Sequence, residues 1–326
     1  MIFSRNPGRR LRRALAGMAA FAALTACGGG TSQYEAFIAL RVIVFGDETS
    51  ALTSTGLKYS VNGVSTVTNA DGTTTTTPDC AAQPTWVQTL AGYYGFVFAE
   101  CNPGNLESTQ ARMLAAAGAK VEDVKVQIDA QVAAGGFRDK DLATVLAGQN
   151  DIIELYQQFP ARTEADLTAD LRARGLRLAQ QVNRLVDLGA KVIIATAPDM
   201  GLTPYAIKQR SEFTDTDRAA LLSRLTAAFN EQLGVNILLD GRYIGLVQTD
   251  LRVQAMVRSP GSFPGLVNVT NGVCLDTAPP PDCSSSTLVE NGSAGSYLWA
   301  DDLRLAASAQ AQIGALAVDR ARRNPF

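Results

Sequence analysis

The chain has 326 residues, of which 46% are hydrophobic, and it contains 29 basic and 31 acidic side chains but no histidine. A chain of this length and apolar content can bury a sizeable core, in one large domain or two small ones. Five of the basic residues precede residue 14, which leaves 24 basic residues against 31 acidic ones and a net charge near −7. This acidic balance argues against nucleic acid as a partner.

The N-terminal segment has the pattern of an export signal. Its arginines are followed by an apolar run, residues 14–26, that is too short to span a bilayer. The run ends in Leu-Thr-Ala-Cys27, which resembles a bacterial lipobox and implies cleavage before Cys27 and lipidation of this residue; an ordinary secretory signal with an incidental cysteine is the alternative. We therefore expect a signal peptide over residues 1–26 and a glycine-rich, flexible tether over residues 27–37. Because no acidic residue directly follows Cys27, the resemblance favours a lipid anchor in the outer membrane of a bacterial cell envelope.

Four further cysteines remain after Cys27. Three pairings are possible, and proximity along the sequence favours Cys80 with Cys101 and Cys274 with Cys283. A disulfide of this kind contributes about 2–4 kcal/mol to stability. Zinc is the weaker interpretation because the chain has no histidine and no close Cys-x-x-Cys pair, so we expect neither a metal nor another cofactor.

Apolar runs typical of strands alternate with helical periodicity along the chain. This alternation predicts a three-layer α/β/α sandwich of the flavodoxin-like kind, with a mostly parallel five-stranded sheet, in one domain over residues 38–326. The expected strands are residues 39–45, 94–99, 142–147, 191–196 and 244–248. The clearest helices are expected from Thr163 to Gly189, from Asp215 or Thr216 to Gly234, and over residues 306–320.

Two segments interrupt this alternation. Residues 60–79 contain an unbroken run of threonines and too few apolar side chains for a strand that is buried on both faces. Residues 258–296 are rich in proline, glycine and serine and contain Cys274 and Cys283. We expect the first segment to be a surface insertion and the second to be a long loop held by a disulfide.

Three of the expected strands end in unusual polar turns. Phe-Gly-Asp-Glu48 follows the first strand, Gly-Gln-Asn150-Asp follows the third, and Ala-Pro-Asp199-Met-Gly follows the fourth. Functional residues of a doubly wound sheet collect at the carboxyl ends of its strands. The first turn is expected to open a helix and to present Glu48 where enzymes place a nucleophile.

Together with Gly118 and with the C-terminal sequence Asp301-Asp-Leu-Arg304, these turns resemble the motifs of the GDSL/SGNH hydrolase family, in particular its bacterial esterase and lipase-like members. The resemblance extends over about residues 40–318, and it implies the flavodoxin-like fold of that family. It also implies that Gly118 and Asn150 are oxyanion-hole donors and that Asp301 orients a catalytic histidine. The family's serine nucleophile is replaced by Glu48, and its histidine is replaced by Arg304.

These two replacements remove the groups that move protons in a serine hydrolase. Arg304 has no lone pair with which to accept a proton from a hydroxyl group, and no histidine occurs elsewhere. Loss of the nucleophile and base typically lowers turnover about 10⁶-fold. A carboxylate about 4 Å from a developing oxyanion also repels it by roughly 4 kcal/mol at an effective dielectric of about 20. We therefore predict a catalytically inactive or strongly impaired protein whose crevice binds a ligand, such as an ester or a carbohydrate ester, or a partner.

The sequence leaves other interpretations of the site open. Arg304 is expected to bridge Glu48 and Asp301, which would replace a Ser-His-Asp chain with a Glu-Arg-Asp chain. The alternative function is an active esterase or lipase-type hydrolase with a non-standard centre, for example Ser50 with Lys58 or Lys120 as its base. Ser50 is more simply explained as a hydroxyl at a helix start with a local hydrogen bond. A scaffolding role in the envelope is a third possibility, and the sequence indicates no oligomeric state.

Overall fold

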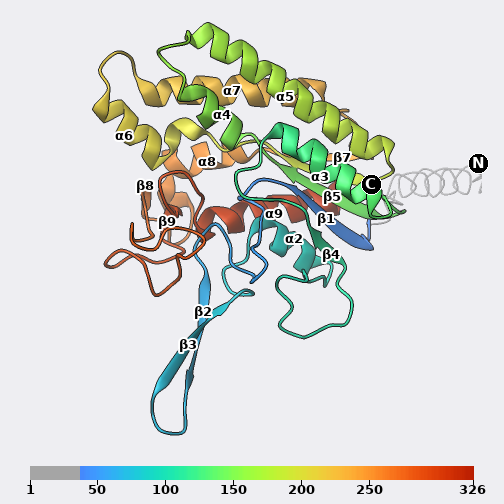
Figure 1. The fold of residues 1–326 in the computed structure, drawn as a ribbon, viewed down its shortest axis with the longest axis vertical. Helices are drawn as coiled ribbons and strands as arrows, with labels where there is room; N and C mark the ends of the chain where they lie inside the picture. The colour runs from blue at the N-terminus through green and yellow to red at the C-terminus, as the bar shows by residue number, and fades with distance from the viewer. Residues whose placement is uncertain (1–36) are drawn as a thin grey trace, which may run out of the picture. The chain divides into compact units, whose positions relative to one another are not determined.

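A five-stranded parallel sheet forms the centre of the chain (Figure 1). The computed structural model describes residues 37–326, so the predicted signal peptide, Cys27 and nearly all of the tether lie outside the described residues. In spatial order the strands are β4 (Ala111–Met113), β1 (Arg41–Gly46), β5 (Asp141–Leu146), β6 (Lys191–Ala195) and β7 (Ile244–Val247). Each strand pairs with its neighbours in parallel, which confirms the predicted sheet.

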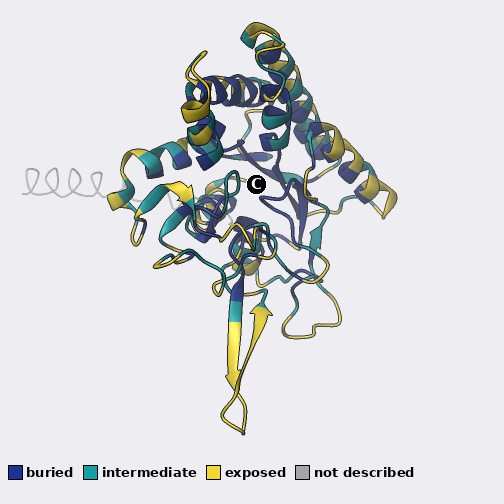
Figure 2. Cartoon of the chain, turned by 60° about the vertical axis from the view of Figure 1, so that its left-hand side comes forward, coloured by how far each residue is buried: buried dark blue, intermediate teal, exposed yellow. Residues whose placement is uncertain are grey.

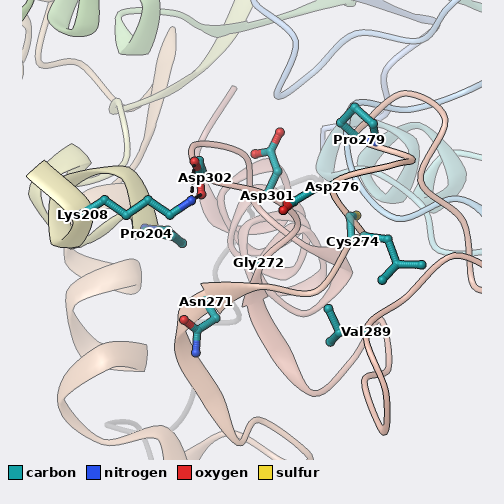
Figure 3. A pocket seen from close by; sticks show the side chains of 11 residues that line it. Pro204, Lys208, Asn271, Gly272, Cys274, Asp276, Pro279, Val289, Asp301 and Asp302 are labelled. Carbon is teal, nitrogen blue, oxygen red and sulfur yellow. Dashed lines mark hydrogen bonds and ion pairs between the residues drawn. The ribbon is translucent and has the colours of Figure 1, made fainter.

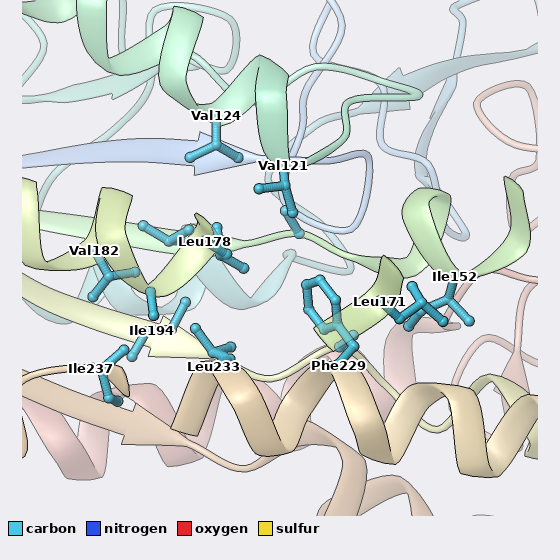
Figure 4. Packing of buried hydrophobic residues seen from close by; sticks show 14 of the residues in the cluster. Val121, Val124, Ile152, Leu171, Leu178, Val182, Ile194, Phe229, Leu233 and Ile237 are labelled. Carbon is cyan, nitrogen blue, oxygen red and sulfur yellow. The ribbon is translucent and has the colours of Figure 1, made fainter. Parts of the chain in front are cut away.

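Helices cover both faces of this sheet. Their bounds are α2 (Trp86–Tyr93), α3 (Val121–Ala133), α4 (Gln149–Tyr156), α5 (Glu164–Asp187), α6 (Pro204–Glu212), α7 (Arg218–Asn236), α8 (Thr249–Arg258) and α9 (Ala307–Arg323). Ile43 and Phe45 of β1 pack into the core beneath α3, α4, α5 and α7, part of which is drawn in Figure 4. Val42 and Val44 pack into the other core, beneath α2, α8 and α9. Because successive strand residues face opposite cores, the predicted three-layer α/β/α sandwich is confirmed.

The capping pattern locates the starts of the two longest helices. The Thr163 hydroxyl accepts a hydrogen bond from a backbone N–H in the first turn of α5, and the Asp217 carboxylate does the same for α7. Helix α7 therefore begins just after the expected position. It also continues past Gly234, where an end was expected, because a glycine inside a helix costs only about 1 kcal/mol relative to alanine.

One predicted strand is wrong. Residues 94–99 form turns and an isolated bridge from Phe98 to Ala111, and the edge strand next to β1 is β4 instead. Gly95 has a φ of +75°, which breaks an extended conformation, and the Tyr94 and Phe96 rings stack with their centroids 5.9 Å apart. The apolar side chains of this segment therefore reach the core from a turn, without a ladder of backbone hydrogen bonds.

The two segments that interrupt the alternation lie outside the sheet. Residues 60–79 contain an antiparallel hairpin of β2 (Gly63–Thr68) and β3 (Thr74–Asp79), which projects from the rest of the chain and is largely exposed (Figure 2). Within residues 258–296 lie a short 3-10 helix (Pro260–Ser262) and β8 (Asn268–Gly272), which pairs in parallel with β9 (Tyr297–Trp299). One disulfide joins Cys80, which directly follows the first segment, to Cys101, and the other joins Cys274 to Cys283 within the second segment, as the spacing favours. Across residues 37–326, no helix is long and apolar enough to cross a membrane.

Candidate active site

The turn after β1 places Glu48 at the carboxyl end of the sheet, with only 6% of the residue exposed. The backbone N–H groups of Ser50 and Ala51 both donate to the Asp47 carbonyl, at 3.0 and 3.2 Å, and no helix follows. The expectation of a helix at this point is therefore wrong, and no helix that begins at Glu48 supplies a dipole to its carboxylate. The side chain must be stabilised by specific hydrogen bonds instead.

A buried glutamine fixes the glycine that precedes this turn. The Gly46 N–H donates to Oε1 of Gln127 at 2.7 Å, and Nε2 of Gln127 donates back to the Gly46 carbonyl at 3.0 Å. Gly46 has a φ of +124°, and a Cβ there would lie 1.9 Å from the Leu146 carbonyl oxygen, so no other residue fits. The role of Gln127 was missed from the sequence, where the only signal is an amide on the apolar face of α3.

One oxygen of Glu48 occupies the position expected for an oxyanion. Its Oε2 accepts a hydrogen bond from the Gly118 N–H at 2.8 Å and another from Nδ2 of Asn150, also at 2.8 Å. The structure thus brings together the residue at the nucleophile position and the two residues at the oxyanion-hole positions. Because both bonds end on a carboxylate, they belong to the stronger, charge-assisted class.

Asp151, the residue after Asn150, connects the segments that carry the two oxyanion-hole donors. One carboxylate oxygen of Asp151 accepts from the backbone N–H of Val121 at 3.1 Å, and the other accepts from the Arg174 guanidinium at 3.0 Å. Asn150 itself donates to the Ala119 carbonyl at 3.1 Å. These bonds tie the loop that carries the backbone donor to the start of α4. The aspartate that ends the Gly-Gln-Asn-Asp turn is the signal for this role in the sequence.

Asp301 and Arg304 form an ion pair after β9. Nη1 of Arg304 donates to Oδ2 of Asp301 at 2.5 Å, while Oδ1 accepts from the backbone N–H groups of Leu303 and Arg304 at 3.0 and 2.7 Å. The guanidinium carbon lies 5.9 Å from the centre of the Tyr59 ring. Asp301 therefore holds the Arg304 side chain, as the resemblance implies that it would hold an imidazole.

The predicted Glu-Arg-Asp chain is formed only in part. Among the residues that the structure describes, Arg304 pairs with Asp301 and makes no ion pair with Glu48. Glu48 instead directs its carboxylate to Gly118 and Asn150. The predicted bridge between Glu48 and Arg304 is therefore wrong, because the Glu48 carboxylate accepts its hydrogen bonds from Gly118 and Asn150.

The groups considered for a serine–lysine centre are engaged elsewhere. Ser50 is fully buried, and its hydroxyl accepts a hydrogen bond from the Trp86 indole at 3.0 Å, so the local backbone bond expected for it is not formed. The Lys58 ammonium donates to two backbone carbonyl groups, at 3.0 and 2.6 Å. Lys120 forms an ion pair with Glu154 at 2.6 Å. The structure brings neither lysine into hydrogen-bond contact with Ser50.

Burial perturbs the pKa of several groups in and near the site, and it raises that of Asp151 even though the Arg174 guanidinium acts to lower it. Burial, and secondly the adjacent Glu48, raise the pKa of the Asp47 carboxyl well above its usual range, although it accepts a 2.9 Å hydrogen bond from the Thr49 N–H. Burial also lowers the pKa of Lys58 to about 8. Asp47 is therefore held toward its protonated form, which limits the repulsion that Glu48 meets in this turn.

A hollow of about 400 Å³ borders Asp301 (Figure 3). The disulfide-held loop supplies one wall, including Asn271 and Asp276, while Lys208 of α6 lies opposite and forms an ion pair with Asp302 at 2.7 Å. The sequence carried no signal for this hollow because a long loop has no periodicity from which its path could be inferred. Within residues 37–326, no cluster of acidic or cysteine side chains is suited to a metal ion.

Comparison with known proteins identifies the family. The model of the GDSL-like Lipase/Acylhydrolase family matches residues 42–238, more than half of the chain, and the chain therefore belongs to this family. A solved structure of a lipolytic protein of the G-D-S-L family from Veillonella parvula is 11% identical, with a TM-score of 0.43, over 86% of this chain and 97% of that one. Axe2, an acetylxylan esterase from Geobacillus stearothermophilus, is 12% identical, with a TM-score of 0.43, over 87% of this chain and 96% of that one. No curated protein matches the chain.

Proposed function

We propose that this protein is an exported, lipid-anchored member of the GDSL family whose hydrolytic centre has been replaced and whose crevice binds a ligand or partner without turning it over. The observation that carries the proposal is the pair of 2.8 Å hydrogen bonds from Gly118 and Asn150 to the Glu48 carboxylate. An ester carbonyl can use these donors only by displacing Glu48. Since a hydrogen bond to a charged group contributes about 1.5–3 kcal/mol, this displacement costs about 3–6 kcal/mol.

The other half of the centre supports the same proposal. Arg304 keeps its guanidinium on Asp301, and a guanidinium cannot take a proton from a hydroxyl group or a water molecule. Loss of both nucleophile and base typically costs a serine hydrolase about 10⁶-fold in turnover. The chain thus retains the hole and the aspartate of the family but has neither group that would drive acyl transfer.

The remaining parts of the proposal concern location and ligand. The apolar run that ends at Cys27 supports export and a lipid anchor in the outer membrane of a bacterial envelope, and the two disulfides suit an oxidising compartment. The hollow beside Asp301 has carboxylate, amide and ammonium groups in its walls, which suits a polar ligand such as an ester or a carbohydrate ester. Palmitate labelling that disappears in Cys27→Ala would support the anchor, and an unlabelled wild-type chain would contradict it.

An ester hydrolysis assay tests the main proposal. The wild-type protein and the variants Glu48→Ala and Ser50→Ala are incubated with p-nitrophenyl esters of short and long acids, with an active esterase as positive control. We expect all three proteins to stay at the rate of the blank. Wild-type turnover that either substitution abolishes would show an active, non-standard centre and would overturn the proposal.

A further inference from the structure

Exposed apolar side chains lie near the amino ends of the sheet strands, on the side of the domain opposite the site. Because the strands are parallel, all of them begin on the same side of the sheet. Glu48 follows the carboxyl end of β1 and therefore lies on the opposite side. Ile38 and Leu40, just before β1, are 63% and 60% exposed, and Leu238 and Leu239, in the connection from α7 to β7, are 43% and 77% exposed. Strands β1 and β7 are three spacings apart, or about 14 Å, so the two pairs lie on one side of the domain.

Basic side chains without ion-pair partners accompany these apolar residues. Arg112 and Arg138 line a hollow of about 360 Å³ together with Leu40, and the Leu40 N–H donates to the Lys140 carbonyl at 2.9 Å. Within residues 37–326, none of the three cations enters an ion pair, and the exposed carboxylate in the same loop is Asp139. We call this surface the strand-start face; it comprises Ile38, Leu40, Arg112, Arg138, Lys140, Leu238 and Leu239.

The path of the chain points this face toward the anchor. Phe37, the first described residue, packs on Phe326 with ring centroids 5.3 Å apart, so both ends of the domain lie beside the strand-start face (Figure 1). Residues 28–37 link Phe37 to Cys27, and this link can extend at most about 36 Å. A domain of about 290 residues is about 50 Å across. The strand-start face, which lies beside the start of this link, is therefore the side of the domain nearest to the anchor.

We infer that the strand-start face rests on the surface of a phospholipid bilayer that contains anionic headgroups. The four apolar side chains enter the boundary between headgroups and acyl chains, and the three cations contact lipid phosphates. This inference rests on the lipid anchor in the proposed function. It orients the crevice away from the membrane, toward ligands or partners in the adjacent aqueous compartment.

Vesicle flotation tests the inference on a chain that has no lipid. Because Ala36–Phe326 is one compact unit that holds both cores and both disulfides, a chain of residues 28–326 retains the fold. It is mixed with vesicles of phosphatidylethanolamine and phosphatidylglycerol at three to one, or of phosphatidylcholine alone. Each cation near an anionic surface contributes about fivefold in affinity, so we expect the anionic vesicles to bind at least about tenfold more tightly.

Two variants define the face. Ile38→Glu combined with Leu239→Glu should weaken binding to the anionic vesicles at least about tenfold. Each substitution replaces an apolar contact with a negative charge that the anionic headgroups repel. Val267→Glu is the matched control, since Val267 is 75% exposed but precedes β8, away from the strand-start face. This control should bind within about twofold of the wild-type chain. Thermal melting of each variant establishes that it is folded.

Three results would overturn the inference. They are equal binding to both kinds of vesicle, undiminished binding of the double variant, and self-association through this face without vesicle binding. Flotation does not depend on lipidation or on ester turnover, whereas labelling of Cys27 and the ester assay test the proposed function. The two proposals can therefore fail separately.

Discussion

Replacing Glu48 with alanine removes the anion that fills the oxyanion hole. The loss comprises two charge-assisted hydrogen bonds of 2.8 Å, each contributing about 1.5–3 kcal/mol. Part of this is offset because the carboxylate is buried and raises the pKa of Asp47, so its removal relieves desolvation and repulsion. We expect a net destabilisation of about 2–3 kcal/mol. At about 0.6 kcal/mol per kelvin for a domain of about 290 residues, the melting temperature falls by about 3–5 °C.

The emptied hole should then bind a small carboxylate from solution. Acetate at ten times its dissociation constant stabilises the folded state by about 1.4 kcal/mol, which corresponds to about 2 °C. The assay is calorimetry of wild type and Glu48→Ala at pH 7, in sodium acetate and in sodium chloride of equal ionic strength. Glu231→Ala is the matched control, since Glu231 pairs with Arg172 and is distant in sequence from both donors.

The decisive quantity is the difference in melting temperature between sodium acetate and sodium chloride. Only Glu48→Ala should melt at a higher temperature in acetate than in chloride. If all three proteins respond equally to acetate, or if Glu48→Ala is as stable as the wild type, then Glu48 does not fill the hole and the reasoning is refuted.

Three further predictions concern neighbouring groups. Asn150→Ala should be less than additive with Glu48→Ala in urea unfolding, with a coupling of about 1–3 kcal/mol, and strict additivity would contradict the shared hydrogen bond. Arg304→Ala should lower stability by only about 0.5–1 kcal/mol, because the ion pair of Arg304 with Asp301 is partly exposed and Arg304 makes no ion pair with Glu48. A much larger drop in melting temperature would indicate that Arg304 also bridges Glu48. The pKa of Lys58 is about 8 in the folded chain against an ordinary 10.5, so the unfolded chain binds more protons between these pH values. The unfolding free energy of the wild type relative to Lys58→Met should therefore rise by up to about 3 kcal/mol from pH 8 to 10.5, and a flat difference measured by urea unfolding would contradict this pKa.

Most of the sheet could be predicted because β1, β5, β6 and β7 are buried on both faces and appear as mostly apolar runs. Strand β4 could not, since it has only three residues, two of them partly exposed. The apolar residues 94–99 gave a stronger signal but contain Gly95, whose φ of +75° departs from the extended conformation of a strand. Burial was thus predictable there, while hydrogen-bond pairing was not.

The site shows the same limit at the level of one side chain. The resemblance to the family's motifs predicts that Gly118 and Asn150 lie near Glu48. It does not predict that Glu48 itself accepts both hydrogen bonds. A glutamate carboxylate extends two carbon atoms beyond the Cβ that would carry a serine hydroxyl, so it reaches past the nucleophile position into the hole. The position of the Arg304 side chain depends on a loop whose path no sequence pattern defines, and this side chain pairs with Asp301.

Hydrolysis of p-nitrophenyl acetate by Glu48→Ser combined with Arg304→His tests the central claim most directly. The shorter serine frees Gly118 and Asn150 for the ester carbonyl, and Asp301 is in place to orient the new imidazole. We expect turnover above the blank in the double variant and none in the wild type or in either single variant. Wild-type turnover that is lost in Glu48→Ala would instead show that Glu48 takes part in catalysis, and a double variant without activity would show that the remaining crevice is not that of an esterase.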